Sequence, residues 1–136
     1  KGVYDRFWVN LDIHRNNAFS SVIMETAFNE GEEWLEQLLE YISGNFDFIR
    51  EYCREHIPQI KPNLPDATYL VWLDCRELGM SNEELKNFMI HKAGLGLNEG
   101  WSFGRSLSGY MRLNAACPRS VIEKALKQLE AAVAAL

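Results

Sequence analysis

The sequence has no excess of basic residues and no basic run. Its 136 residues contain 14 Lys and Arg against 19 Asp and Glu, which gives a formal net charge of −5 at pH 7. A surface that binds nucleic acid concentrates Lys and Arg on one face. We therefore expect no nucleic-acid partner.

Long apolar runs and paired cysteines are also lacking. No stretch approaches the roughly 18 apolar residues of a membrane span, and the opening KGVYDRFWVNLD has no signal-peptide core. Cys53, Cys75 and Cys117 are far apart, form no CxxC and have no histidine at metal-ligand spacing. We expect reduced thiols, no metal site, no membrane partner and a cytoplasmic protein. Because the chain begins without methionine, we expect a fragment.

Apolar material is sufficient for one core, since 47% of the residues are hydrophobic and 12% are aromatic. Apolar residues at three- and four-residue intervals predict four helices. These are a short helix within residues 14–28, a long helix from an N-cap at Asn29 to about Glu55, a helix from a Ser81–Glu84 capping box to about Lys92, and a last helix opened by Pro118.

Stretches between the helices predict strands. Prolines make residues 57–67 a short edge strand followed by a turn. The almost continuously apolar residues 68–73 predict a central strand covered on both faces. A brief strand at residues 95–98 precedes a glycine-rich, mobile loop, and residues 109–116 form the last strand. Strands between helices predict an α/β sandwich of two layers.

The last strand carries the most informative polar residue. Strand alternation places Arg112 on the face opposite the apolar side chains of Met111 and Leu113. A lone guanidinium is expensive to bury, so an anion should meet it. Its planar fork can bind both oxygens of a carboxylate. On the residues alone, an internal salt bridge to one of the 19 acids is the more common arrangement, and a carboxylate from outside is the alternative.

Large aromatic residues and glycines fill the loop before this strand. Trp101 and Phe103 have no periodic reason to be buried, so they either line a pocket or pack over the sheet edge. The glycines at positions 94, 96 and 100 follow a helix and precede a loop. A phosphate-binding loop needs a strand, then glycines, then a helix. The glycines therefore indicate loop flexibility and close backbone packing.

Four segments, taken together and in order, resemble a known family. They are ETAFNEGEEWLEQLLEYISGNFDFI, PDATYLVWLD, GLGLNEGWSFG and GYMRLNAACPRS. The chain is similar to the class I and II aminotransferase superfamily, whose members are fold type I enzymes dependent on pyridoxal 5'-phosphate (PLP). Within it, the chain resembles the cystathionine β-lyase, or C–S lyase, branch of the MalY/PatB type. The similarity runs from about Asn17 to the end.

The resemblance implies that residues 29–136 are the carboxy-terminal small domain of such an enzyme, and that residues 1–28 are a remnant of the interdomain segment. The small domain is an α/β (α+β) two-layer sandwich, with a mostly antiparallel sheet of three to four strands and helices packed on one face. The parent would be a homodimeric C–S β-lyase or aminotransferase acting on amino acids. PLP and its lysine belong to the large domain, so this chain would contain no catalytic, cofactor-binding or metal-binding residue and would be inactive alone.

Site residues follow from the same resemblance. Arg112 matches the arginine that binds the substrate α-carboxylate, so the expected anion comes from outside the domain. Asn98, Trp101 and Phe103 fall on the loop that approaches the substrate. The alternative function is a stand-alone, non-catalytic binding or interaction module with the same fold.

Overall fold

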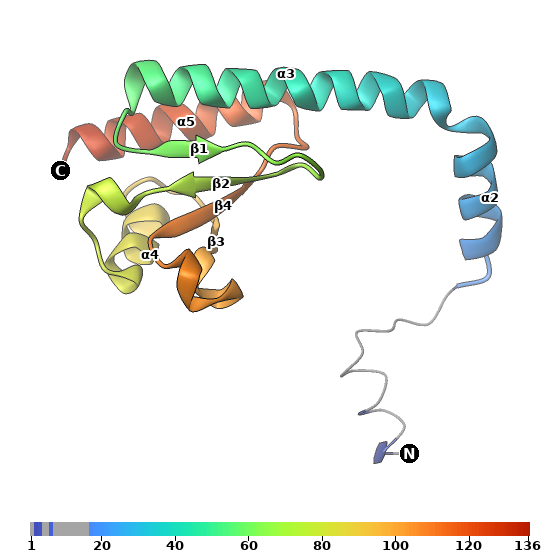
Figure 1. Ribbon diagram of the computed structural model, residues 1–136, viewed down its shortest axis with the longest axis horizontal. Coiled ribbons are helices and arrows are strands. Elements are labelled where there is room, and N and C mark those ends of the chain that lie inside the picture. The colour runs from blue at the N-terminus through green and yellow to red at the C-terminus, as the bar shows by residue number, and fades with distance from the viewer. Residues whose placement is uncertain (1, 4–5, 7–16) are drawn as a thin grey trace. The chain divides into compact units, whose positions relative to one another are not determined.

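The computed structural model describes residues 2, 3, 6 and 17–136. Along the chain it forms two compact units, one ending at Leu38 and the other comprising Leu39–Leu136 (Figure 1). Within the predicted interdomain remnant, residues 1–28, the structure describes residues 2, 3, 6 and 17–28. Among the described residues, no helix is both long and apolar enough to cross a membrane.

The first unit contains helix α2 (Ser20–Glu30) and the first turns of α3 (Glu32–His56). Helix α2 corresponds to the short helix predicted within residues 14–28, of which residues 14–16 lie outside the described part. The predicted N-cap at Asn29 is wrong, because Asn29 lies inside α2. Gly31 separates the helices instead: its N–H donates to Ala27 O at 3.0 Å and its carbonyl accepts from Leu35 N at 2.9 Å. A Cβ there would lie 2.4 Å from Ala27 O, so the junction requires glycine.

The second unit contains the rest of α3 and a four-stranded sheet with strand order β1-β2-β4-β3, in which every neighbouring pair is antiparallel. This arrangement confirms the predicted α/β class and small antiparallel sheet. Its further elements are β1 (Lys61–Asn63), β2 (Leu70–Asp74), η1 (Arg76–Leu78), α4 (Asn82–His91), β3 (Asn98–Glu99), η2 (Gly100–Phe103), η3 (Arg105–Leu107), β4 (Tyr110–Asn114) and α5 (Arg119–Ala134).

The predicted helices of this unit are confirmed. Helix α3 continues through Ser43 and Gly44 to His56, close to the expected end. Helix α4 begins with the capping box, in which Ser81 Oγ accepts from Glu84 N at 3.3 Å and Ser81 N donates to Glu84 Oε2 at 2.8 Å. Pro118 directly precedes α5.

The core occupies one face of the sheet. Val71 and Leu73 of β2 and Met111 of β4 are buried in one cluster with apolar residues from α3, α4 and α5. The opposite face of β2, with Leu70, Trp72 and Asp74, is only half-buried. The prediction that β2 is covered on both faces is therefore wrong for the described chain, because the helices pack on one side alone.

Two strand boundaries also differ from the predictions. Strand β2 begins at Leu70, and Thr68 has a φ of 73°, a left-handed conformation that no regular strand contains. Strand β3 is Asn98–Glu99 and not residues 95–98, because Leu95 and Leu97 pack against the core before pairing begins. The predicted loop after it contains two 3₁₀ turns, η2 and η3.

A buried asparagine joins α3 to the end of β4. Asn45 is 0% exposed, and its Nδ2 donates to Ala115 O at 2.9 Å and to Cys117 O at 3.1 Å. Its Oδ1 accepts from Arg119 Nε at 2.7 Å. A buried polar side chain with every group paired fixes one arrangement of its partners. Asn45 therefore holds the connection between β4 and α5 in place.

We expect Asn45→Ala to lower the free energy of unfolding by about 2–4 kcal/mol, because a buried carbonyl, a part-buried carbonyl and a guanidinium lose their partner. Urea denaturation of the 136-residue chain measures the loss. Asn87→Ala, at an exposed position of α4, is the matched control and should change it by less than about 0.5 kcal/mol. Equal effects of the two substitutions would contradict this role of Asn45.

Candidate functional site

Three side chains form a row across the sheet, on the face opposite the core. The register pairs Trp72 of β2 with Arg112 of β4, and Arg112 with Asn98 of β3. Directly opposed residues of neighbouring strands project to the same face and lie in contact distance. The strand pairing therefore positions Arg112 between an aromatic side chain and an amide.

Arg112 has a polar and an aromatic partner. Its Nη2 donates to Asn98 Oδ1 at 3.0 Å, and its guanidinium carbon lies 4.3 Å from the centre of the Phe103 ring. Phe103 in turn meets Trp72 edge to face, with ring centres 5.5 Å apart and an interplanar angle of 81°. The four side chains are one cluster, which we call the Arg112 cluster: Trp72, Asn98, Phe103 and Arg112.

No acid neutralises Arg112 within the part of the chain that the structure describes. It forms no ion pair there, and its Nε is buried without a hydrogen-bond partner. The internal salt bridge that the residues alone favoured is therefore not found among residues 17–136. A guanidinium that keeps its charge and has an unpaired buried donor is suited to bind an anion.

A second arginine beside the same face is arranged differently. Arg76 donates from Nε to Asp74 Oδ1 at 2.9 Å and from Nη2 to Asp74 Oδ2 at 2.7 Å, and it lies over the Tyr110 ring at 5.0 Å. Its hydrogen bonds lower the pKa of Asp74 from 3.8 to about 2, with a smaller contribution from the Tyr110 hydroxyl. Arg76 is thus paired with an acid, whereas Arg112 has only the neutral Asn98 amide as a polar partner among the described residues.

Glycines allow the loop before β4 to adopt the tight turn that places Phe103 beside Arg112 of β4. A Cβ on Gly100 would lie 2.4 Å from Leu107 O and 2.9 Å from Tyr110 O, so the turn can close only around glycine. Gly104 has a φ of 143°, which other residues rarely adopt. Asn82 Oδ1 accepts from Gly109 N at 3.0 Å and anchors the end of the loop to α4.

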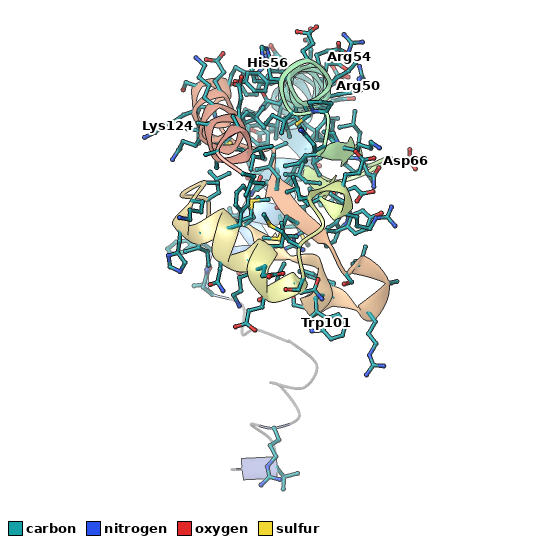
Figure 2. The ribbon with its side chains drawn as sticks, turned by 90° about the vertical axis from the view of Figure 1, so that its left-hand side faces the viewer. Arg50, Arg54, His56, Asp66, Trp101 and Lys124 are labelled. Carbon is teal, nitrogen blue, oxygen red and sulfur yellow. The ribbon has the colours of Figure 1, made fainter. Side chains whose placement is uncertain are left out.

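Trp101 is separate from the Arg112 cluster. It borders a hollow with Asn82, Lys86 and Glu99, where Lys86 and Glu99 form an ion pair at 2.7 Å. Figure 2 shows Trp101 at the opposite end of the second unit from Arg50 and His56. Of the four residues predicted for the site, the structure thus brings together Asn98, Phe103 and Arg112.

Sequence reasoning missed Trp72, the fourth member of the cluster. Its strand was recognised, but which residue of that strand lies beside Arg112 depends on the pairing register. Only the alternation along residues 70–74 could have indicated its face, and the apolar run there concealed it.

The cysteines play no part in this site. Cys53, Cys75 and Cys117 are free, which confirms the expected thiols. Burial raises the pKa of Cys53 and of Cys75 to about 12, so neither is a thiolate near neutral pH. Among the described residues no group of His, Cys, Asp and Glu could hold a metal ion.

We expect the ion pair of Asp74 with Arg76 to make the free energy of unfolding depend on pH in the acidic range. The pKa of Asp74 is lower in the folded chain, so its contribution is present above about pH 4 and is lost as the pH falls toward 2. The difference in free energy of unfolding between the wild type and Asp74→Asn should therefore shrink across that range. Asp66→Asn, at an exposed position, should show no such dependence; a constant difference for Asp74→Asn would contradict the assignment.

Comparison with known proteins shows close similarity to PLP enzymes. No family model matches the chain. It is 35% identical over 117 residues to cystathionine β-lyase PatB of Bacillus subtilis, a match that covers 86% of this chain and 30% of PatB. The chain therefore spans about a third or less of the relatives that it matches.

Solved structures match over the same region. A PLP-bound protein of Clostridium difficile 630, assigned as an aminotransferase, superimposes with a TM-score of 0.85 and 46% identity over 95% of this chain and 33% of that one. Cystalysin from Treponema denticola, which contains PLP, gives a TM-score of 0.79 and 35% identity over 82% of this chain and 28% of that one.

Proposed function

We propose that the chain is the small domain of a fold type I PLP-dependent enzyme. It belongs to that family, because it is homologous to the carboxy-terminal region of MalY/PatB cystathionine β-lyases and of aminotransferases. The parent would act on amino acids as a C–S β-lyase or an aminotransferase. Residues 29–136 are proposed to form the small domain, and residues 1–28 part of the interdomain segment.

The observation that carries this proposal is the environment of Arg112. Its guanidinium has no acidic partner among the described residues, and one of its buried donors is unpaired. An amino-acid substrate brings a carboxylate, whose two oxygens match the guanidinium fork. We infer that Arg112 binds this carboxylate and orients the substrate, a positioning role that needs no proton transfer.

Asn98 is suited to assist Arg112. A guanidinium can only donate, so the oxygen of the Asn98 amide must face Arg112 Nη2, as it does at 3.0 Å. The Asn98 NH₂ group is then directed elsewhere and can donate to the same carboxylate. Trp101 lies in the same turn as Phe103 but outside the Arg112 cluster. If Trp101 contacts the substrate, the contact would be with a part of the substrate other than its carboxylate.

The cofactor would be held by the large domain. PLP, when bound, supplies an electron sink for the carbanion formed at the substrate Cα. The described lysines do not fit the role of cofactor lysine. Lys61 pairs with Glu77 and Lys86 with Glu99, while Lys92 at the end of α4 and Lys124 and Lys127 of α5 are exposed to solvent. The residues of this chain would thus bind and orient the substrate without carrying the cofactor.

Exposed apolar residues in the first unit support the proposal that another protein part covers this surface in the full-length enzyme. Five large apolar side chains at the N-cap and within α2 are each at least 62% exposed: Phe19, Val22, Ile23, Met24 and Phe28. Such a patch marks a surface that another protein part covers. The large domain of the same polypeptide, and in the full-length enzyme the second subunit of a homodimer, are the partners that we propose.

We expect Arg112→Ala, in the polypeptide that includes the large domain, to lower kcat/KM for an amino-acid substrate by on the order of 10²-fold, with a raised KM. Its PLP absorption should remain, since Arg112 does not hold the cofactor. Arg105→Ala, an exposed arginine of η3 without a side-chain partner among the described residues, is the control and should keep wild-type kinetics. Unchanged kinetics in Arg112→Ala would refute the proposed role.

We also expect the 136-residue chain to be inactive alone, because none of its described lysines fits the cofactor site. Mixed with PLP and cystathionine, the purified chain should yield no pyruvate above a protein-free control. Turnover that scales with the concentration of the chain, and persists through repeated purification, would contradict the division of roles between the domains.

A further inference from the structure

We propose that Phe103 and Trp72 are positioning residues that hold the Arg112 guanidinium ready for a substrate carboxylate. This inference rests on the proposed function, since it concerns the same site. It assigns Phe103 a contact with Arg112 and not with substrate, and it adds Trp72, which no sequence pattern placed there.

The geometry defines how the guanidinium is held. Phe103 lies against it at 4.3 Å, and Trp72 fixes the Phe103 ring from the side at 5.5 Å. Arg112 Nε is buried without a hydrogen-bond partner, while Nη2 donates to Asn98 Oδ1. The aromatic contact and the single amide contact together restrict rotation of the side chain and leave the Nη end accessible to a ligand.

An aromatic partner serves this purpose better than an acidic one. A carboxylate would fix the guanidinium equally well but would neutralise it and compete with the substrate, as Asp74 does for Arg76. The face of an aromatic ring attracts a cation without supplying a full negative charge. Arg112 can therefore be ordered before binding and still present its whole charge to the incoming carboxylate, which lowers the entropy lost on binding.

The loop that carries Phe103 is shaped for this contact. Gly100 and Gly104 adopt positions that side chains would obstruct or strain, and Ser102 Oγ donates to Glu99 O at 2.7 Å within the turn. Phe103 is about half exposed in the described chain. Its location is therefore set by the backbone of η2 and not by burial of its ring, as expected of a residue kept for a specific contact.

The test measures the binding of two ligands to the PLP-loaded full-length enzyme by the change in cofactor absorption. One ligand is an amino acid, and the other is the amine with the same side chain and no carboxylate. We expect Phe103→Leu to weaken binding of the amino acid by on the order of tenfold and to leave binding of the amine unchanged. Phe103→Tyr, which keeps the ring, should restore wild-type affinity, and Trp72→Leu should give a smaller loss of the same kind.

Two comparisons complete the test. Tyr69→Leu, at an exposed aromatic residue next to β2, is the control and should affect neither ligand. In the Arg112→Ala background, Phe103→Leu should cause no further loss of amino-acid affinity, because a positioning residue acts through Arg112. An additional loss in that background would mean that Phe103 touches the substrate itself and would overturn the inference, as would equal weakening of both ligands.

The outcome also separates this inference from the proposed function. If Arg112→Ala loses affinity for the amino acid while Phe103→Leu does not, only the positioning role is overturned. If Arg112→Ala binds the amino acid as the wild type does, the proposed carboxylate site is overturned, and the positioning role with it.

Discussion

The pairing of β2 with β4 is the constraint on which both the core and the candidate site depend. Its register places Val71 opposite Leu113 on the core face and Trp72 opposite Arg112 on the other face. Because side chains alternate along a strand, a slip by one residue would expose the apolar set and bury the guanidinium. The free energy gained by burying one face therefore also fixes the position of the polar residue on the other.

The pairing is held at its far end by a side chain from a different layer. Strand β4 ends at Asn114, and Asn45 of α3 binds the carbonyls of Ala115 and Cys117 directly after it. An apolar contact is not directional and would allow the strand end to shift along the helix. The three hydrogen bonds made by the buried Asn45 amide are directional and fix its position. The long helix, the end of β4 and the start of α5 are thereby held in one arrangement.

The parts of this structure that the sequence predicted are those that depend on local pattern. Helical spacing, the Ser81 capping box and the alternation that sets Arg112 apart from the core are visible within a few residues. Local pattern failed at Asn29, where a good N-cap residue lies inside α2 because Gly31 provides the break. Local pattern also failed for Trp72. The register pairs this residue with Arg112, which lies 40 positions later in the sequence, and no local signal gives the pairing of such distant strands.

Arg76 and Arg112 show how one sheet face can hold two arginines in different states. Both lie against an aromatic ring, at 5.0 Å and 4.3 Å, so cation–π contact alone does not distinguish them. The difference is the neighbouring residue: Asp74 satisfies Arg76 with two hydrogen bonds, whereas Asn98 gives Arg112 one neutral acceptor. A neutral amide orients a guanidinium without cancelling its charge. The proposed ability of Arg112 to bind a carboxylate therefore depends on position 98 lacking a charge as much as on the arginine itself.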